Sequence, residues 1–207
     1  MFITLEGLDF SGKSTALAAI KDKLPEGTVF TREPGGTPKS EEIREILTKH
    51  SLELSGLEKL NLFFQSRYDH VQNLIEPSLK AGKLVISDRY IGSTFAYQVG
   101  GDGIPFEVVN QKALELFDKF PLAKPDLTIY FQISPDVRKQ RFSLRNSDAL
   151  DGYDEAFYQR VEQAYIDGIK ASSKEALIFD ANLTPEDVAD KLLLIIDDFM
   201  EDQEECQ

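Results

Sequence analysis

A glycine-rich segment near the N-terminus constrains this chain more than any other feature. Residues 7–14 read Gly-Leu-Asp-Phe-Ser-Gly-Lys-Ser and match the pattern G-x-x-x-x-G-K-[ST], with Thr15 next. Residues 2–6 before them predict a strand, and a helix is predicted to follow, up to about Leu24. Glycines at this spacing let successive backbone N–H groups surround phosphate oxygens, at a helix N-terminus whose dipole favours anions. The segment therefore predicts a phosphate-binding loop for a nucleoside triphosphate.

The residue types of this loop suggest individual tasks. Lys13 would reach the β- and γ-phosphates, and the Ser14 hydroxyl would bind Mg²⁺. Residue frequencies give a chance match to the pattern in about one protein in a hundred, and the flanking strand and helix make chance rarer still. The expected nucleotide site consists of Gly7, Leu8, Asp9, Phe10, Ser11, Gly12, Lys13, Ser14 and Thr15.

Strands and helices alternate along the rest of the chain. Further strands are predicted at 28–31, 84–87, 127–133 and 176–179. Further helices are predicted at about 40–50, 56–81 with an interruption at Pro77, 105–120, 136–145, 155–171 and 185–200. This alternation predicts an α/β fold whose five-stranded parallel sheet is flanked by helices on both faces. The sequence contains no internal repeat or linker, so one domain over residues 1–207 is expected.

Composition narrows the range of partners. Asp and Glu outnumber Lys and Arg by 36 to 23, which gives a net charge of −13. A surface this acidic repels duplex DNA and anionic membranes, so no nucleic acid and no membrane is expected as a partner. The longest aliphatic run, 192–196, is too short to cross a bilayer. With one cysteine, no internal disulfide is possible, and a cytoplasmic location is expected.

The C-terminal end of the chain is strongly acidic. The last eleven residues hold six acids and no base. Like charges without partners favour a solvated, frayed end, and no further role is predicted for this tail.

A second charged cluster follows a predicted strand. Residues 84–87 are Leu-Val-Ile-Ser, and Asp88, Arg89 and Tyr90 come next. Ligands of doubly wound sheets bind at the carboxyl ends of strands, which makes Asp88 a candidate Mg²⁺ ligand and Arg89 a candidate phosphate clamp. The alternative is a buried ion pair that closes the strand. The chain has no guanine-reading Asn-Lys-x-Asp and is short for a motor or transporter ATPase, so a small kinase is favoured.

With these motifs the chain resembles the bacterial thymidylate kinase family over nearly its full length. The matching segments are 7–15, Arg-Glu-Pro-Gly-Gly-Thr at 32–37, Phe63 with Arg67, Asp-Arg-Tyr at 88–90 and Ser-Thr-Phe-Ala-Tyr-Gln at 93–98. The resemblance implies a three-layer P-loop NTPase fold. It also implies transfer of the γ-phosphoryl group of ATP to dTMP with Mg²⁺, giving dTDP and ADP for dTTP synthesis, and a homodimer.

The resemblance further implies how the thymine base is recognised. Phe63 would stack on the ring and Arg67 would donate to its O4, and the two residues are one helical turn apart. An arginine distinguishes a carbonyl from an amine at this position. Thr94 and Gln98 would complete the base edge, and Tyr97 would favour deoxyribose by crowding the 2′ position. The alternative for Phe63 is an ordinary core residue.

For the sugar and the acceptor phosphate the resemblance implies four more residues. Asp9 would accept a hydrogen bond from the 3′-hydroxyl. Arg44 and Arg89 would hold the monophosphate, and Glu33 would order the pocket near them.

The lid over ATP, expected at about 141–156, departs from the family pattern. Some family members carry an arginine inside the phosphate loop, where this chain has Phe10, and bacterial members supply it from the lid. Here Asp-Gly-Tyr-Asp at 151–154 replaces the usual Asp-Arg-x-Glu, so one expected arginine is missing.

Other arginines could take its place. Arg138, Arg141 and Arg145 lie at i, i+3 and i+7 and are expected to point together toward ATP. Arg145 is the first candidate for the catalytic arginine and Arg141 the second, in addition to Lys13 and Arg89. The alternative is a solvated basic helix face.

Two other functions stay open at this point. One is a related kinase that acts on dUMP or on a deoxynucleoside. The other is a nucleotide-binding regulator that has lost turnover through its altered lid. Arg44 and Arg89 favour an acceptor that already carries a phosphate, whereas intact Lys13, Ser14 and Asp88 favour turnover.

Overall fold

The computed structural model describes residues 1–145 and 154–205. Its centre is a five-stranded sheet whose strands pair in parallel, in the order β2-β3-β1-β4-β5. The strands are β1 (Phe2–Glu6), β2 (Val29–Arg32), β3 (Val85–Asp88), β4 (Leu127–Gln132) and β5 (Glu175–Asp180). The predicted α/β class with a five-stranded parallel sheet is confirmed, and each strand lies within one or two residues of its predicted position.

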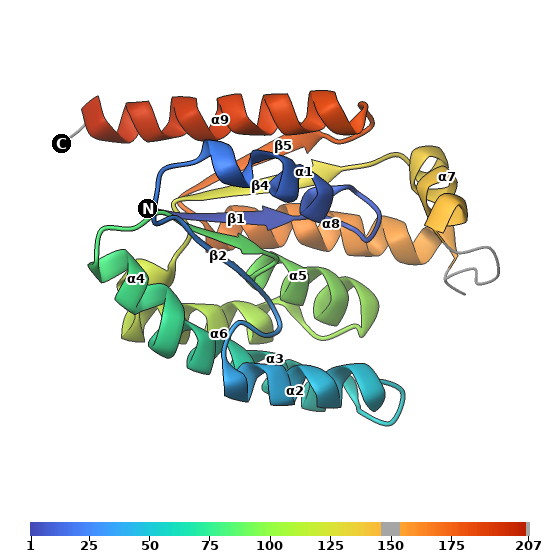
Figure 1. The fold of residues 1–207 in the computed structure, drawn as a ribbon. Helices are drawn as coiled ribbons and strands as arrows, with labels where there is room; N and C mark the ends of the chain where they lie inside the picture. Colours follow the sequence, from blue (N-terminus) through green and yellow to red (C-terminus); the bar gives the residue numbers. More distant parts are fainter. Residues whose placement is uncertain (146–153, 206–207) are drawn as a thin grey trace.

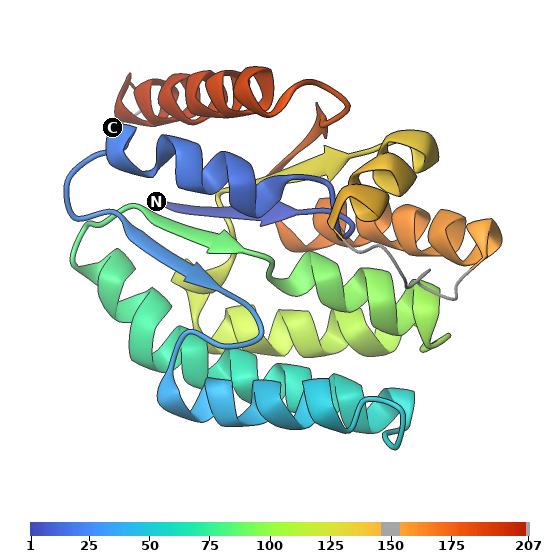
Figure 2. The ribbon, with the colours of Figure 1, turned by 45° about the vertical axis from the view of Figure 1, so that its right-hand side comes forward.

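Helices cover both faces of this sheet (Figure 1). One face carries α1 (Lys13–Ile20) and α9 (Pro185–Glu205). The other carries α5 (Ile91–Thr94), α6 (Phe106–Lys119) and α8 (Glu155–Ser172), with α2 (Pro38–Lys49) and α3 (Gly56–His70) packed side by side next to them (Figure 2). The short helix α4 (Glu76–Lys80) follows α3, and α7 (Pro135–Arg145) stands near the carboxyl ends of the strands.

The central strand β1 supplies side chains to the cores on both faces. Ile3 and Leu5 are fully buried against residues of α1 and α9, among them Ile20 and Leu192. Phe2, one position away, points to the opposite face and packs with the core beneath α3 and α6. Burial on both faces explains why the strand reads as an almost continuous apolar run. The phosphate-binding loop that follows β1 therefore starts from a rigid, dry element.

The long helical segment predicted at 56–81 departs from expectation near its end. The interruption is a π-helical stretch at Val71–Ile75, and it lies before Pro77. The N–H of Glu76 bonds to the carbonyl of Val71, five residues back. Proline lacks an N–H and crowds the preceding turn, so a wider turn ahead of Pro77 lets the chain continue as helix into α4.

Residues 90–104 received no helix or strand from the sequence, yet they contain α5 and a π-helical continuation, Phe95–Gly101. Glycine favours neither element, so local propensity hides the helix. Close packing explains the glycines: a Cβ on Gly92 would lie 2.9 Å from the Glu6 carboxylate, and one on Gly100 would lie 2.6 Å from the Arg160 carbonyl oxygen. Tertiary contacts with β1 and α8 thus decide the conformation here.

The acidic tail was expected to fray, but α9 continues through Glu205. Its apolar residues Leu192, Ile196 and Phe199 are buried at helical spacing against the sheet, and this anchors the helix. Among the described residues, no helix is long and apolar enough to span a membrane.

Candidate active site

The phosphate-binding loop closes around the Lys13 side chain. Its ammonium donates to the carbonyl oxygens of Gly7 at 2.8 Å and Leu8 at 3.0 Å, and to the Ser11 hydroxyl at 3.2 Å. A Cβ on Gly7 would lie 2.8 Å from the Phe131 carbonyl oxygen, so the loop can approach β4 this closely only with glycine. Burial, together with the nearby charge of Arg89, lowers the pKa of Lys13 to about 7.

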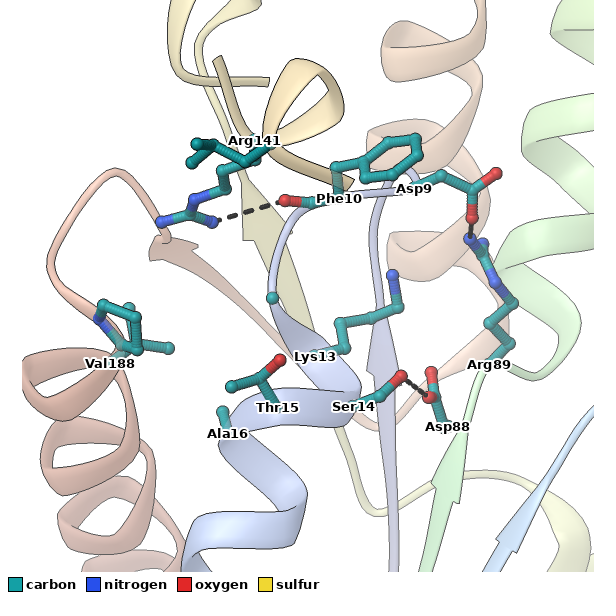
Figure 3. Close-up of a pocket in the computed structure, with 13 residues that line it drawn as sticks. Asp9, Phe10, Lys13, Ser14, Thr15, Ala16, Asp88, Arg89, Arg141 and Val188 are labelled. Carbon is teal, nitrogen blue, oxygen red and sulfur yellow. Dashed lines mark hydrogen bonds and ion pairs between the residues drawn. The ribbon is translucent and has the colours of Figure 1, made fainter. Parts of the chain in front are cut away.

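A cavity of about 430 Å³, here called the loop cavity, opens above this loop (Figure 3). It lies between α1, the start of α9, and Arg141 of α7. The residues that line it are Asp9, Phe10, Gly12, Lys13, Ser14, Thr15, Ala16, Asp88, Arg89, Arg141, Leu144, Pro185 and Val188. Most of the expected nucleotide site thus faces one cavity, whereas the Leu8 side chain is buried in the core near Tyr130.

Two side-chain oxygens of the kind that bind Mg²⁺ meet in the loop cavity. The Ser14 hydroxyl donates to the Asp88 carboxylate at 2.6 Å (Figure 3). A hydroxyl and a carboxylate are suitable ligands for Mg²⁺, which is usually bound by one or two protein oxygens together with substrate phosphates and water. Within residues 1–145 and 154–205, no cluster of three or more His, Cys, Asp or Glu could hold a metal by itself. Ser14 and Asp88 therefore fit Mg²⁺ that arrives with a nucleotide.

A second cavity of about 220 Å³, here called the Arg67 cavity, lies on the other side of Asp9 and Arg89. The residues that line it are Asp9, Glu33, Pro34, Phe63, Arg67, Arg89, Tyr90, Ser93, Thr94 and Tyr97. Asp9 and Arg89 line both cavities. This pair is therefore the point at which groups bound in the two cavities would meet.

Arg67 is held rigidly in the wall of its cavity. Its side chain is only 1 % exposed, and its Nε–H donates to the Glu33 carboxylate at 2.7 Å. Its Nη2 donates to the Tyr90 carbonyl oxygen at 3.1 Å and to the Thr94 hydroxyl at 3.0 Å. The rings of Phe64 and Tyr90 each lie 5.1 Å from the guanidinium carbon. The group is therefore immobilised by both hydrogen bonds and aromatic contacts.

Arg89 is positioned by polar side chains from three parts of the chain: the phosphate-binding loop, α5 and α8. It donates to Asp9 at 2.6 Å, to the Tyr165 hydroxyl at 2.7 Å and to the Ser93 hydroxyl at 3.0 Å. Its backbone has φ = 70°, a conformation that is costly for a residue with a side chain and that often occurs at functional sites. Tyr165 in turn donates to the Gly7 carbonyl oxygen, which ties Arg89 to the phosphate-binding loop.

Glu6, immediately before the phosphate-binding loop, binds the segment that follows Arg89. Its buried carboxylate accepts hydrogen bonds from the backbone N–H groups of Tyr90 and Ser93, and from the Ser93 hydroxyl at 2.6 Å. Burial raises the pKa of Glu6 above its ordinary value, opposed by the Ser93 hydrogen bond and the Arg89 charge. The end of β1 and the start of α5 are therefore locked together.

Arg138 and Arg141 of α7 do not point together, which corrects the sequence prediction for these two arginines. Arg138 is 9 % exposed and stacks on the Tyr158 ring of α8 at 3.5 Å. Arg141 turns instead to the loop cavity and donates to four carbonyl oxygens: those of Phe10 and Ser11 in the loop, and those of Ala181 and Leu183 before α9 (Figure 3 shows the Phe10 contact). The helix face is not a solvated basic stripe, because neighbouring elements take up each of these two arginines separately.

Other predicted residues lie away from the cavities or outside the described residues. Arg44 donates to the Pro34 carbonyl oxygen at 2.8 Å and is absent from the lining of the Arg67 cavity. Gln98 is also absent from it, and donates to Asp102 at 3.2 Å. Arg145 ends α7, and its side chain lies outside the described part of the chain, as do residues 146–153 of the expected lid.

Several residues of the site were missed by the sequence analysis. Tyr165, Ser93 and Glu6 hold Arg89 and its strand, and His70 bonds to Glu33 at 3.0 Å. Glu6 had a detectable signal, because a carboxylate at the end of a mostly apolar strand, predicted to be covered on both faces, must find partners. Tyr165 and His70 lie in ordinary helical sequence, and only the fold brings them to the site.

Comparison with known proteins gives consistent matches. The family model described as thymidylate kinase matches residues 5–192. The chain is 38% identical over 208 residues to a thymidylate kinase of Chromobacterium violaceum, covering 97% of this chain and 95% of that one. It is 37% identical over 202 residues to that of Mesoplasma florum, covering 95% and 94%. The crystal structure of thymidylate kinase from Ehrlichia chaffeensis superimposes with a TM-score of 0.75 at 30% identity, covering 95% of this chain and 98% of that one.

Proposed function

The chain belongs to the thymidylate kinase family and transfers the γ-phosphoryl group of ATP to dTMP, and from that premise we propose how its residues divide the work. ATP occupies the loop cavity and dTMP occupies the Arg67 cavity. The observation that carries this division is that, among the residues that the structure describes, Asp9 and Arg89 alone line both cavities. A γ-phosphate and an acceptor phosphate that approach from opposite sides of this pair would be within reach of each other.

Recognition of the thymine base falls to the wall of the Arg67 cavity. Phe63 offers a ring for stacking, and Arg67 offers a guanidinium nitrogen to O4. Thr94 already accepts a hydrogen bond from Arg67, and its hydroxyl proton is available to the base edge. Tyr97 and Asp9 face the sugar from the same cavity. Gln98 reaches the base edge only if its side chain leaves Asp102, which makes it a weaker part of the proposal.

The transfer itself needs charge neutralisation more than proton abstraction. An oxygen of the dTMP phosphate attacks the γ-phosphorus of ATP, and the bond from that phosphorus to the β–γ bridging oxygen breaks, so that ADP leaves with the electron pair. The attacking oxygen is already ionised, so a strong general base is unnecessary. Lys13 and Arg89 stabilise the charge that spreads over the transferred group. Ser14 and Asp88 would hold Mg²⁺, which neutralises phosphate charge when bound with ATP.

The remaining cations act around this centre. Arg44 binds the acceptor phosphate together with Arg89 after releasing the Pro34 carbonyl oxygen. The lid spans about residues 141–156, with Arg145 as the arginine that reaches the transferred phosphoryl group and Arg141 as the second candidate. The bonds of Arg141 to four carbonyl oxygens favour Arg145, because Arg141 could reach the phosphate only by giving them up.

We also propose a cytoplasmic homodimer. The single cysteine and the charged substrates support the location. Exposed apolar side chains, among them Leu57 on α3 and Leu114 on α6, support a surface for self-association, since they are 59 % and 52 % exposed. Light scattering coupled to gel filtration would give about twice the chain mass of 23.3 kDa if this is correct, and the chain mass itself if it is wrong.

The acceptor assignment is tested by measuring ADP release with MgATP and a panel of separate acceptors: dTMP, dUMP, dCMP, dGMP, UMP and thymidine. Rapid turnover with dTMP alone, or with dTMP and then dUMP, supports the proposed division. Preference for thymidine would contradict the role of Arg44 and Arg89 in binding an acceptor phosphate. Binding of ATP and dTMP without any product would favour the alternative function, a nucleotide-binding regulator that has lost turnover through its altered lid.

A further inference from the structure

We propose that His70 is a positioning residue for recognition of the acceptor base, acting through Glu33 on Arg67. The inference rests on the proposed role of Arg67 in reading the base and assigns a task to a residue that no motif marks. His70 is the last residue of α3 and is completely buried. It does not line the Arg67 cavity, so it reaches a ligand only through other side chains.

The two oxygens of the Glu33 carboxylate bind two different partners. Oxygen Oε2 accepts from Arg67 Nε at 2.7 Å, and oxygen Oε1 accepts from His70 Nδ1 at 3.0 Å. Because a carboxylate only accepts, Nδ1 must carry the proton. Glu33 is 5 % exposed, and the two hydrogen bonds fix it from opposite ends. Without His70, the carboxylate would lose the bond that fixes its rotation and leave Oε1 buried without a partner.

His70 is itself held in place through its second ring nitrogen. Its other ring nitrogen, Nε2, lies 2.7 Å from the Thr31 hydroxyl. The backbone at Gly36 covers this contact: a Cβ there would lie 2.5 Å from Nε2 and 2.6 Å from the Thr31 hydroxyl oxygen. The imidazole is therefore held from both nitrogens and has no room to turn. β2, the Glu33 loop and α3 are thus joined through one side chain.

The guanidinium of Arg67 keeps one donor nitrogen for a ligand. Arg67 uses Nε and Nη2 for protein partners, whereas its buried Nη1 has no hydrogen-bond partner among the described residues. A buried donor without a partner costs free energy, and a carbonyl oxygen in the adjoining cavity would satisfy it. Since Nη1 is fixed relative to the edge that Glu33 binds, rotation of Glu33 would displace Nη1. His70 therefore controls the aim of the donor.

The test compares His70→Leu with His70→Asn, using the full chain. Asparagine has a similar donor at the position of Nδ1 but nothing at Nε2, whereas leucine fills space without any donor. We expect His70→Leu to raise the KM and Kd of dTMP about tenfold or more, as loss of a hydrogen bond to a charged group would. The KM of ATP and kcat at saturating dTMP should stay within about twofold. His70→Asn should restore most of the dTMP affinity.

Discrimination between dTMP and dCMP provides a second readout. His70→Leu should lower the ratio of kcat/KM for dTMP to that for dCMP, because a loosely held arginine discriminates a carbonyl from an amine less well. His50, the other histidine, is exposed and paired with Glu53, so His50→Leu is the matched control and should change neither quantity.

Three outcomes would overturn the inference. Unchanged dTMP affinity in a folded His70→Leu would remove His70 from recognition. Equal losses for ATP and dTMP, or equal losses in the Leu and Asn variants that follow their melting temperatures, would make it a structural core residue. If the wild-type protein turns over dTMP but Arg67→Ala binds it normally, the proposed role of Arg67 fails first, and this result is distinguishable from the other two.

Discussion

The two cavities that meet at Asp9 and Arg89 are built in opposite ways. In the Arg67 cavity, the groups that would read the base are fixed by buried protein partners before any ligand is present. In the loop cavity, Lys13 and Arg141 bind carbonyl oxygens of the loop and its surroundings. On the proposed division, a preorganised wall would recognise the base, whereas the phosphates would have to replace the carbonyl oxygens that Lys13 and Arg141 bind in this structure. Substitutions should accordingly separate into effects on acceptor affinity and effects on turnover.

The largest effect is expected on the loop side. Lys13→Met removes the cation that stabilises the transferred phosphoryl group, so kcat should fall about 10³-fold. The Kd of dTMP should change little, because Lys13 does not line the Arg67 cavity. Steady-state kinetics and calorimetric titration with dTMP measure the two quantities. Lys170→Met, an exposed lysine at the end of α8, is the control. A comparable loss of dTMP affinity would show that the two cavities are not independent.

The next effect tests the preorganised wall. Arg67→Ala should lower kcat/KM for dTMP more than about 10²-fold while the Kd of ATP changes little. It should also lower the free energy of unfolding by about 3 kcal/mol, because buried Glu33 would lose the guanidinium that neutralises its charge and keep the hydrogen bond from His70. Chemical denaturation measures the second quantity. Adding Glu33→Gln should recover part of the stability and none of the dTMP activity. Equal losses for dTMP and ATP would contradict the assignment to the base.

The same contrast explains how far the sequence could be interpreted. Local spacing was enough to predict two parts of the site. These are the phosphate-binding loop and the pair Asp88 and Arg89 at the end of β3. The wall around Arg67 could be inferred only in part: Phe63 and Arg67 share a helix face, but the bond from His70 to Glu33 joins positions 37 residues apart. Arg138 and Arg141 of α7 show the opposite limit. Their spacing predicted one shared direction, whereas the separate neighbours Tyr158 and the loop carbonyl oxygens divided them.

A smaller effect sharpens the loop side. Arg145→Ala should lower kcat about 10- to 100-fold, as expected for loss of a charge-assisted hydrogen bond in the transition state. Arg141→Ala should instead raise the KM of ATP, because the loop loses its connection to the residues before α9. Single-turnover kinetics separate the transfer step from nucleotide binding. If Arg145→Ala is silent and Arg141→Ala is inactive, Arg141 is the catalytic arginine and must leave its carbonyl partners during turnover.

The smallest expected signal, a proton uptake, tests the loop side most directly. Burial holds the pKa of Lys13 at about 7 in the free protein. Triphosphate charges bound beside it would raise this pKa, since they favour the ammonium form. At pH values well above 7 the free protein has largely lost this proton, so MgATP binding should take up a proton at Lys13, approaching one per site near pH 8.5. At pH 6 Lys13 is protonated before and after binding, and its contribution vanishes.

Calorimetry of MgATP binding in buffers with different ionisation enthalpies measures this uptake. Lys13→Met should abolish the pH-dependent part, whereas dTMP binding should show the same proton balance in the wild-type protein and in this variant. Uptake that is equal at pH 6 and pH 8.5, or that persists in Lys13→Met, would place its origin elsewhere. The expected result would mean that burial keeps Lys13 partly uncharged in the free protein, although carbonyl oxygens surround it. Binding of the anionic nucleotide would then favour the ammonium form, which acts as the catalytic cation.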